Sequence, residues 1–405
     1  MSGGWSAKGG WFPDPDYDYE TRLILGATAS SIGDVGLVLA AIDKITNLDA
    51  QTWFDAWLAM AVDLEARADA ALAAGHLRTA RWAYLTASQY YSEALVFVDA
   101  LADQSVLLPT FKKGRAAWEK VVDASGGAFV RVEVPYEDTT LPGYLLRPDA
   151  TGSARPTLVM TNGSDEPLPA VWGGGAAEAL SRGWNVFAFD GPGQQSMLFE
   201  RGVPFRYDWE AVLTPVIDVV AARPDVDAAA LTGYGISQGG YWITRALAFE
   251  HRMVAAIADP GAVDVSATWT SKLSPQQLHL LDTGQKDAFN AITPDHSNPK
   301  AEWTLAFRAK PYGASDAFDL FTEVRKYQVR DVVGKITTPL LILNPDDEQF
   351  FPGQPEELYG LLPGEKAIIG FSQAQGANFH CQPTGRQLAH TQMLDWLADH
   401  LPARS

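Results

Sequence analysis

A serine between two glycines is the residue of this chain best suited to nucleophilic chemistry. Ser237 lies between Gly235 and Gly239 in the stretch GYGISQGG. A serine hydroxyl is presented for attack at a sharp strand-to-helix turn, where small neighbours allow a strained and closely packed backbone. A short apolar run ends at Ile236, and a helical pattern follows the second glycine. The context predicts a nucleophile at Ser237, against the alternative of a glycine-rich turn that contains a serine by chance.

A nucleophilic serine needs a base and an acid, and both follow it in the chain. His380 lies in SQAQGANFHCQP, after the last predicted strand, and three carboxylates follow the strand before it, at Asp346, Asp347 and Glu348. We expect His380 to be the base, against a hydrogen-bonded surface histidine. Asp347 is preferred as the acid that holds the imidazole in one tautomer, and Asp346 is expected to cap the next turn.

The oxyanion formed in such an attack requires two backbone N–H donors. One is expected from Gln238, next to the serine. The other is expected from Gly163 or Ser164, in the loop after TLVMTNG, where a glycine permits close approach. The competing interpretation is that Asn162 and Gly163 only form a turn.

Other residues near this predicted site have more than one interpretation. Asp165 can orient a substrate, act on a proton or cap a helix. Tyr241 and Trp242, just after the serine motif, are expected to contact the substrate, although core packing and substrate stacking give the same pattern in one sequence. The DGPGQ stretch at residues 190–194 lacks the lysine of a phosphate-binding loop and is interpreted as a turn beside the pocket.

The elements that must position these residues form two domains. Residues 1–124 show helical patterns with almost no strand signal, and residues 125–405 alternate short β-branched runs with helical lengths. The pattern predicts an α/β fold, with a mostly parallel eight-stranded sheet between helices and a hairpin at its start. The long stretch of about 262–330 is expected to be a lid insertion. The eight runs begin at Phe129, Gly143, Thr157, Asn185, Ala229, Met253, Pro339 and Lys366.

Composition narrows the possible partners. The formal net charge of -18 opposes binding to nucleic acid and to anionic membranes. No run of about 18 apolar residues and no secretory leader is present, so we expect a cytoplasmic protein. One cysteine, Cys381, permits no internal disulfide, and the seven histidines lack ligand spacing, so neither a metal nor a cofactor is expected.

Five ordered motifs resemble one branch of the α/β-hydrolase superfamily, and the resemblance covers nearly the whole chain. The motifs are NGSDEP, FDGPGQ, GYGISQGGYW, NPDDEQFFPGQ and GANFHCQP. This branch includes the dihydroxypseudooxynicotine hydrolase of nicotine breakdown and the fungal yellowish-green polyketide-shortening hydrolases. The resemblance implies a cofactor-free serine hydrolase with a triad of Ser237, Asp347 and His380, a small-molecule substrate and a homodimer. Asp165 falls where the nicotine enzyme has a glutamate important for activity, but aspartate is one methylene shorter and TNG replaces a Gly-Gly pair.

The leading hypothesis is therefore hydrolysis of a carbon–carbon bond next to a ketone, in a hydrophobic aromatic or polyketide-like molecule. The same triad would serve a carboxylesterase, a lactonase or an acyltransferase, because all share attack by serine on a carbonyl. A non-catalytic ligand-binding protein on a hydrolase fold is the alternative from another class.

Overall fold

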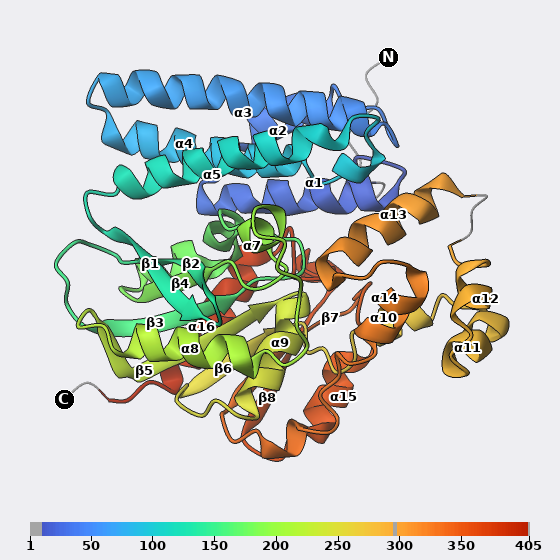
Figure 1. Ribbon diagram of the computed structural model, residues 1–405. Helices are drawn as coiled ribbons and strands as arrows, with labels where there is room; N and C mark the ends of the chain where they lie inside the picture. Colours follow the sequence, from blue (N-terminus) through green and yellow to red (C-terminus); the bar gives the residue numbers. More distant parts are fainter. Residues whose placement is uncertain (1–9, 295–297, 404–405) are drawn as a thin grey trace.

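Helices alone fill the described chain before the first strand. The structure is a computed structural model and describes residues 10–294 and 298–403. The first five helices form a layer that lies over one edge of the molecule, above the sheet in Figure 1. They are α1 (Pro15–Ala27), α2 (Val35–Ile42), α3 (Ala50–Ala73), α4 (Leu77–Ala94) and α5 (Leu107–Asp123).

The helical layer is held together by aromatic side chains at helical spacing. Trp53 and Trp57 of α3 are fully buried, and the Trp57 ring meets that of Tyr90 on α4 with centroids 5.0 Å apart. The chain reverses between α3 and α4 at Gly75, whose φ of 77° is readily adopted only by glycine. Asp49 caps α3 by accepting the N–H groups of residues 51 and 52. This layer is a helical domain with its own apolar core.

An eight-stranded sheet forms the centre of the α/β part of the chain. The strand order is β1-β2-β4-β3-β5-β6-β7-β8; β1 and β2 form an antiparallel hairpin, β2 is antiparallel to β4, and all other neighbours are parallel. Each of the eight predicted runs coincides with one of these strands, so the predicted fold class is confirmed. The strands are β1 (Phe129–Tyr136), β2 (Thr139–Leu146), β3 (Arg155–Thr161), β4 (Asn185–Phe189), β5 (Val226–Ile236), β6 (Ala255–Asp259), β7 (Leu340–Pro345) and β8 (Lys366–Phe371).

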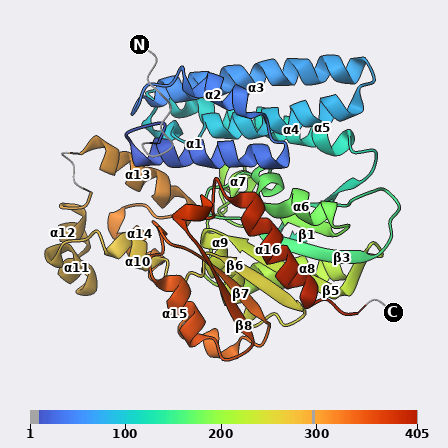
Figure 2. The same cartoon turned by 180° about the vertical axis from the view of Figure 1, so that it is seen from behind.

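Helices cover both faces of the sheet, which explains why its central strands are apolar throughout. In β3, Val159 belongs to the core on one face, whereas Leu158 and Met160 belong to the core on the other. Figures 1 and 2 show α8 and α9 over one face and α6 and α16 over the other. The helices of this domain outside the insertion are α6 (Ala177–Ser181), α7 (Gln195–Phe199), α8 (Glu210–Ala221), α9 (Gln238–Leu247), α15 (Gln354–Leu361) and α16 (Arg386–Asp399).

An insertion of helices separates β6 from β7 in the described chain. Its outer helices α11 and α12 stand at the side of the molecule in both ribbon views (Figures 1 and 2). Its α13 lies between the helical domain and the sheet, and Lys310, just after α13, forms an ion pair with Asp99 of the helical domain (2.8 Å). The insertion comprises α10 (Ser266–Thr270), α11 (Pro275–Asp282), α12 (Lys286–Asn290), α13 (Pro299–Ala309) and α14 (Ala317–Val324).

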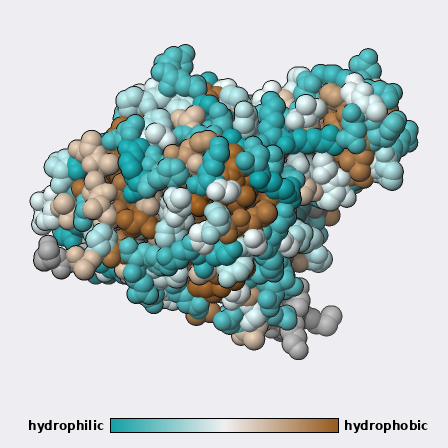
Figure 3. Space-filling model, turned by 90° about the horizontal axis from the view of Figure 1, so that it is seen from below, coloured by the Kyte–Doolittle hydropathy of each residue, from teal (hydrophilic) through white to brown (hydrophobic). Residues whose placement is uncertain are grey.

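The face opposite the helical domain is mostly hydrophilic, and polar residues border its separate apolar areas (Figure 3). Across the described ranges, no helix combines the length and the apolar character that crossing a bilayer requires.

Candidate active site

The turn after β5 holds Ser237 in a strained conformation. Its backbone has φ 56° and ψ -126°, in a region that side chains other than glycine rarely adopt. A Cβ atom at Gly235 would lie 2.1 Å from the carbonyl oxygen of Gly239, and one at Gly239 would lie 2.4 Å from that of Thr161. Both flanking glycines are therefore required by the close approach of three backbone segments. The local sequence folds as a strand, a sharp turn and a helix, as the pattern predicts.

His380 lies between the serine and a carboxylate. Its Nε2 atom is 2.9 Å from Ser237 Oγ, and its Nδ1 atom is 2.8 Å and 2.9 Å from the two carboxylate oxygens of Glu348. His380 and Glu348 are buried, with 3 % of each side chain exposed. This is the arrangement in which a neutral imidazole removes a proton from a hydroxyl while a carboxylate stabilises the charge that develops on the ring.

The predicted pairing of Asp347 with His380 is wrong. The residues after β7 still pair with the chain beyond β8, because the N–H of Asp347 donates to the carbonyl of Asn378 (2.8 Å). The Asp347 carboxylate is exposed and accepts the Asn378 side-chain amide (2.6 Å). Only the next residue, Glu348, turns inward, where the N–H groups of the residues at 350 and 351 also bind its carboxylate (2.9 Å and 3.0 Å).

Burial and mutual attraction shift the pKa values of both Glu348 and His380. Burial opposes the charged form of each group, but the mutual attraction outweighs it. The pKa of Glu348 is held below its ordinary value by His380 and by the backbone N–H donors. The pKa of His380 is raised above 6.5 by Glu348, with smaller contributions from Asp259 and Asp165. Asp165 thus lies close enough for its negative charge to act on the imidazole.

The loop after β3 lies directly against the serine. A Cβ atom at Gly163 would be 2.9 Å from Ser237 Cβ, so only glycine fits here. Within the described residues, no acceptor binds the backbone N–H of Gly163 or of Ser164. Gln238 is the first residue of α9, where a backbone N–H has no partner within the helix. The structure thus brings together the three residues predicted to surround the oxyanion.

The DGPGQ turn holds this loop in place, a role that the sequence does not reveal. Gln194 donates its side-chain amide to the carbonyls of Asn162 and Gly163 (both 2.9 Å) and accepts the N–H of Gly191 (2.8 Å). With its carbonyls bound, the loop has a fixed orientation beside the nucleophile.

The same turn is tied to the helical domain. Asp190, 1 % exposed, accepts hydrogen bonds from Arg115 of α5 and from the Ser196 hydroxyl. The helical domain therefore bears on the geometry of the loop beside Ser237 as well as on the space above it.

Two further elements cover the site. On α1, Tyr19 donates its hydroxyl to the carbonyl of His380 (3.1 Å), and its ring meets that of Phe350 with centroids 5.9 Å apart. From the insertion, Tyr312 donates its hydroxyl to the side-chain oxygen of Gln238 (3.1 Å). The helical domain and the insertion therefore both contact residues of the site.

A charged pair spans the loop after β3 and the insertion. Asp165 forms an ion pair with Arg308 of α13, and the two side chains are 44 % and 37 % exposed. Glu20 of α1 lies near this pair; burial and the negative charge of Asp165 raise its pKa to about 8, although Arg308 opposes the shift. Glu20 therefore keeps its proton to a higher pH than an ordinary carboxyl group.

The expected substrate contact of Tyr241 and Trp242 is wrong. Both side chains are 0 % exposed and belong to the core under α8 and α9. The Trp242 ring stacks on that of Trp209 with centroids 4.3 Å apart. The Tyr241 hydroxyl and the Trp242 indole N–H donate to the backbone carbonyls of residues 207 and 206 (2.8 Å and 3.1 Å), so neither is free for a ligand.

The arrangement is suited to acyl chemistry. In the part of the chain that the structure describes, no group of three or more His, Cys, Asp or Glu side chains could hold a metal ion. The chain's own residues bring together a serine hydroxyl, an imidazole and backbone N–H groups that have no acceptor among the described residues.

Comparisons with known proteins find similar proteins that are named as hydrolases or a hydrolyase. No family model matches the chain. The hydrolyase ccsE of Aspergillus clavatus is 31 % identical over 340 residues, which cover 78 % of this chain and 77 % of that protein. The hydrolase LUC6 of a Fusarium species is 29 % identical over 405 residues, covering 95 % and 96 %. Among solved structures, 2,6-dihydroxy-pseudo-oxynicotine hydrolase matches with a TM-score of 0.72 and 19 % identity, over 93 % of this chain and 96 % of that one.

Proposed function

The chain belongs to the α/β-hydrolase family, and we propose that it is a serine-dependent hydrolase that cleaves a carbon–carbon bond next to a ketone. The observation that carries the proposal is the position of His380, which contacts Ser237 Oγ on one side and the Glu348 carboxylate on the other. In this assignment Ser237 is the nucleophile, His380 the base, and Glu348 the acid that orients the ring.

The first half of the reaction attaches the substrate to the enzyme. Ser237 Oγ attacks one carbonyl carbon of a 1,3-diketone while His380 Nε2 takes the hydroxyl proton. The carbonyl oxygen becomes negative, and the N–H groups of Gln238 and of Gly163 or Ser164 donate to it. When this intermediate collapses, the bond between the carbonyl carbon and the central carbon breaks, and the electron pair leaves as an enolate.

The second half releases an acid. The proton on His380 passes to the enolate, which departs as a ketone, and the acyl group remains as an ester on Ser237. His380 then removes a proton from water, and the resulting attack on the ester releases a carboxylic acid and restores the serine.

The charges around the site favour an enolate as the leaving group. An enolate carries its negative charge on an oxygen, and Arg308 of the insertion, paired with Asp165 in the loop after β3, would offer this oxygen a guanidinium partner. Glu20 is a second proton donor near the same place, because its pKa is about 8.

The test compares two substrates of similar shape, an aryl 1,3-diketone and the matching aryl ester, with mass-spectrometric identification of products. We expect the wild type to convert the diketone to a ketone and a carboxylic acid, and Ser237→Ala to lose this activity by about 10⁴-fold or more. Cleavage of the ester alone would leave the triad intact but contradict the proposed bond. Acyl transfer to added alcohol in place of acid release would indicate an acyltransferase. Unchanged turnover in a folded Ser237→Ala would contradict the whole assignment.

A further inference from the structure

A groove lies between the helical domain and the catalytic domain, away from Ser237. Its volume is about 590 Å³, within the range of small-molecule sites. The groove adjoins the end of α1, at Ala29 and Ser30, whereas Tyr19 near the start of α1 contacts His380. At 1.5 Å per residue, ten residues of helix place the groove about 15 Å from that contact. None of the residues that line it belongs to the candidate active site.

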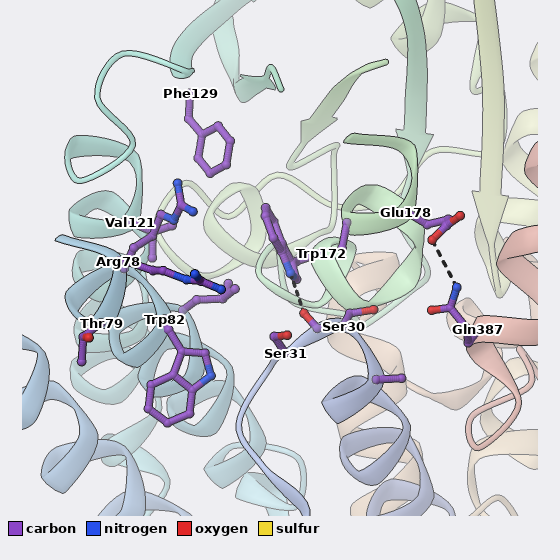
Figure 4. A pocket seen from close by; sticks show the side chains of 14 residues that line it. Ser30, Ser31, Arg78, Thr79, Trp82, Val121, Phe129, Trp172, Glu178 and Gln387 are labelled. Atoms are coloured by element: carbon purple, nitrogen blue, oxygen red, sulfur yellow. Dashed lines mark hydrogen bonds between the residues drawn. The ribbon is translucent and has the colours of Figure 1, made fainter. Parts of the chain in front are cut away.

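Aromatic rings form much of its wall. In Figure 4, Arg78 and Trp82 of α4 lie on one side of the open space and Trp172 on the other. The rings of Phe129 and Trp172 meet with centroids 5.9 Å apart. The Trp172 indole N–H donates to the carbonyl of Ser30 (2.9 Å), which fixes the plane of the ring. The aromatic rings therefore form an apolar part of a wall whose other residues are largely polar, and this part is suited to a flat ligand.

Two arginines on α4 give the groove a positive charge. Within the described residues, neither Arg78 nor Arg81 has an ion-pair or hydrogen-bond partner. By contrast, Arg67 on the adjacent helix faces Asp63 (2.6 Å). The protein has a net charge of -18, yet these two guanidinium groups have no carboxylate partner among the described residues.

The acidic residue in the groove does not neutralise them. Glu178 of α6 forms an ion pair with Arg182 (3.0 Å), and its other oxygen accepts the side-chain amide of Gln387 (3.2 Å), the bond drawn in Figure 4. Glu178 is thus paired with Arg182, which also pairs with Asp395, and within the described residues it forms no ion pair with Arg78 or Arg81.

We propose that this groove is a second binding site, which takes an organic anion with a flat aromatic body. The aromatic wall would cover the body of the ligand, and the guanidinium groups of Arg78 and Arg81 would bind its carboxylate or sulfonate, the oxygen geometry that arginine matches with paired donors. The proposal does not depend on which bond the enzyme cleaves.

The test uses 8-anilinonaphthalene-1-sulfonate, whose fluorescence rises on binding to an apolar surface. We expect saturable binding of one molecule by the full-length protein. Arg78→Gln/Arg81→Gln should raise the Kd at least tenfold, the effect of losing about 1.4 kcal/mol of charge-assisted bonding. N-phenyl-1-naphthylamine, which has the same rings but no sulfonate, should bind the wild type and this variant alike.

A matched control separates the effect of contacts in the groove from the effect of the protein's overall charge. Lys112→Gln/Lys113→Gln removes two exposed positive charges from α5, outside the groove, and should change the Kd less than twofold. Ala29→Trp, at an exposed position on the rim, should block both probes. The proposal is overturned if the wild type shows no saturable binding, if the arginine variant binds as tightly as the wild type, or if the lysine variant loses as much affinity. Circular dichroism checks that each variant is folded, and Ala29→Trp tests the site if the arginine variant is not.

Discussion

The two halves of the candidate active site are built in different ways. On the catalytic side, Ser237, Glu348 and His380 all follow strands of one sheet, and each is held by contacts of 2.6–3.0 Å with neighbouring backbone or with one another. On the covering side, the contacts join distant parts of the chain. Tyr19 meets His380 across 361 residues, and Arg308 meets Asp165 across 143, with both charged side chains more than one third exposed.

This difference suggests that the strand-end residues carry out the reaction, whereas the covering residues determine which substrate binds. The strand-end residues are fixed by a buried scaffold, so their geometry does not depend on the substrate. The cover comes from the helical domain and the insertion, which share apolar cores with the sheet and place polar side chains such as those of Tyr19 and Arg308 beside the site. Replacing those side chains therefore need not disturb the triad. Replacements on the catalytic side should therefore lower kcat, and those on the covering side should act mainly on KM.

The largest effect is expected from Glu348→Gln, which keeps the size of the side chain but removes its charge. By analogy with the loss of the carboxylate in other triads, kcat should fall by about 10³–10⁴-fold. Asp347→Asn is the matched control, because this neighbouring carboxylate is exposed and, among the described residues, hydrogen-bonds to Asn378 alone. It should change kcat less than about threefold. A large loss in Asp347→Asn with a small one in Glu348→Gln would reverse the assignment of the acid.

The same pair of variants should differ in pH dependence. His380 must be neutral to act as a base, and its pKa is raised above 6.5, so kcat/KM of the wild type should rise with pH through an apparent pKa above that value. In Glu348→Gln the attraction that raises the pKa of His380 is gone while burial still lowers it. The rise of kcat/KM with pH should therefore occur at lower pH than in the wild type. Asp347→Asn should keep the wild-type pH dependence. Stopped assays across pH 5–9 measure the shift, and an unmoved rise in Glu348→Gln would contradict the pairing.

A smaller effect is expected on the covering side. Arg308→Gln and Asp165→Asn should each raise KM for the diketone, lowering kcat/KM by about tenfold, the consequence of losing roughly 1.4 kcal/mol. The double variant should lose little more than either single one, because both remove the same pair. Arg325→Gln is the control, since the Arg325–Asp282 ion pair lies in the same insertion with similar exposure of the arginine. Equal losses in this control would show that the insertion is merely destabilised.

The smallest effect is expected from Glu20→Gln and concerns stability. With a pKa of about 8, folded Glu20 keeps a proton that the unfolded chain has lost above pH 5, so its contribution to stability falls as pH rises from 5 to 8. The variant should therefore gain more at pH 8 than at pH 5, by about 1–3 °C in Tm. Glu200→Gln, at an exposed position, serves as the control. An equal change at both pH values would place Glu20 in an ordinary environment.

The sequence predicted the strand-end side of the site better than the covering side. The eight strands, the turn at Ser237 and the position of His380 depend on short stretches in which β-branched runs, glycines and chain order act locally. The acid was missed because Asp346, Asp347 and Glu348 are adjacent and of one chemical type, and only pairing beyond the strand decides which of them turns inward. Once strands are placed, that pairing is the signal that could separate them.

The cover was less accessible to sequence reasoning. Tyr19 and Arg308 reach the site through contacts between domains, which no local pattern records. Trp242 shows the converse error, since an aromatic residue beside the nucleophile was assigned to the substrate although its ring is buried against Trp209.

The most direct test of the account is covalent labelling of the protein with a fluorophosphonate, read by intact mass and peptide mapping. We expect one adduct per chain, on Ser237, formed quickly by the wild type and by Asp347→Asn, slowly by Glu348→Gln, and not at all by Ser237→Ala. An unlabelled wild type, or equal labelling of Ser237→Ala, would contradict the claim that the strand-end residues form a working serine nucleophile.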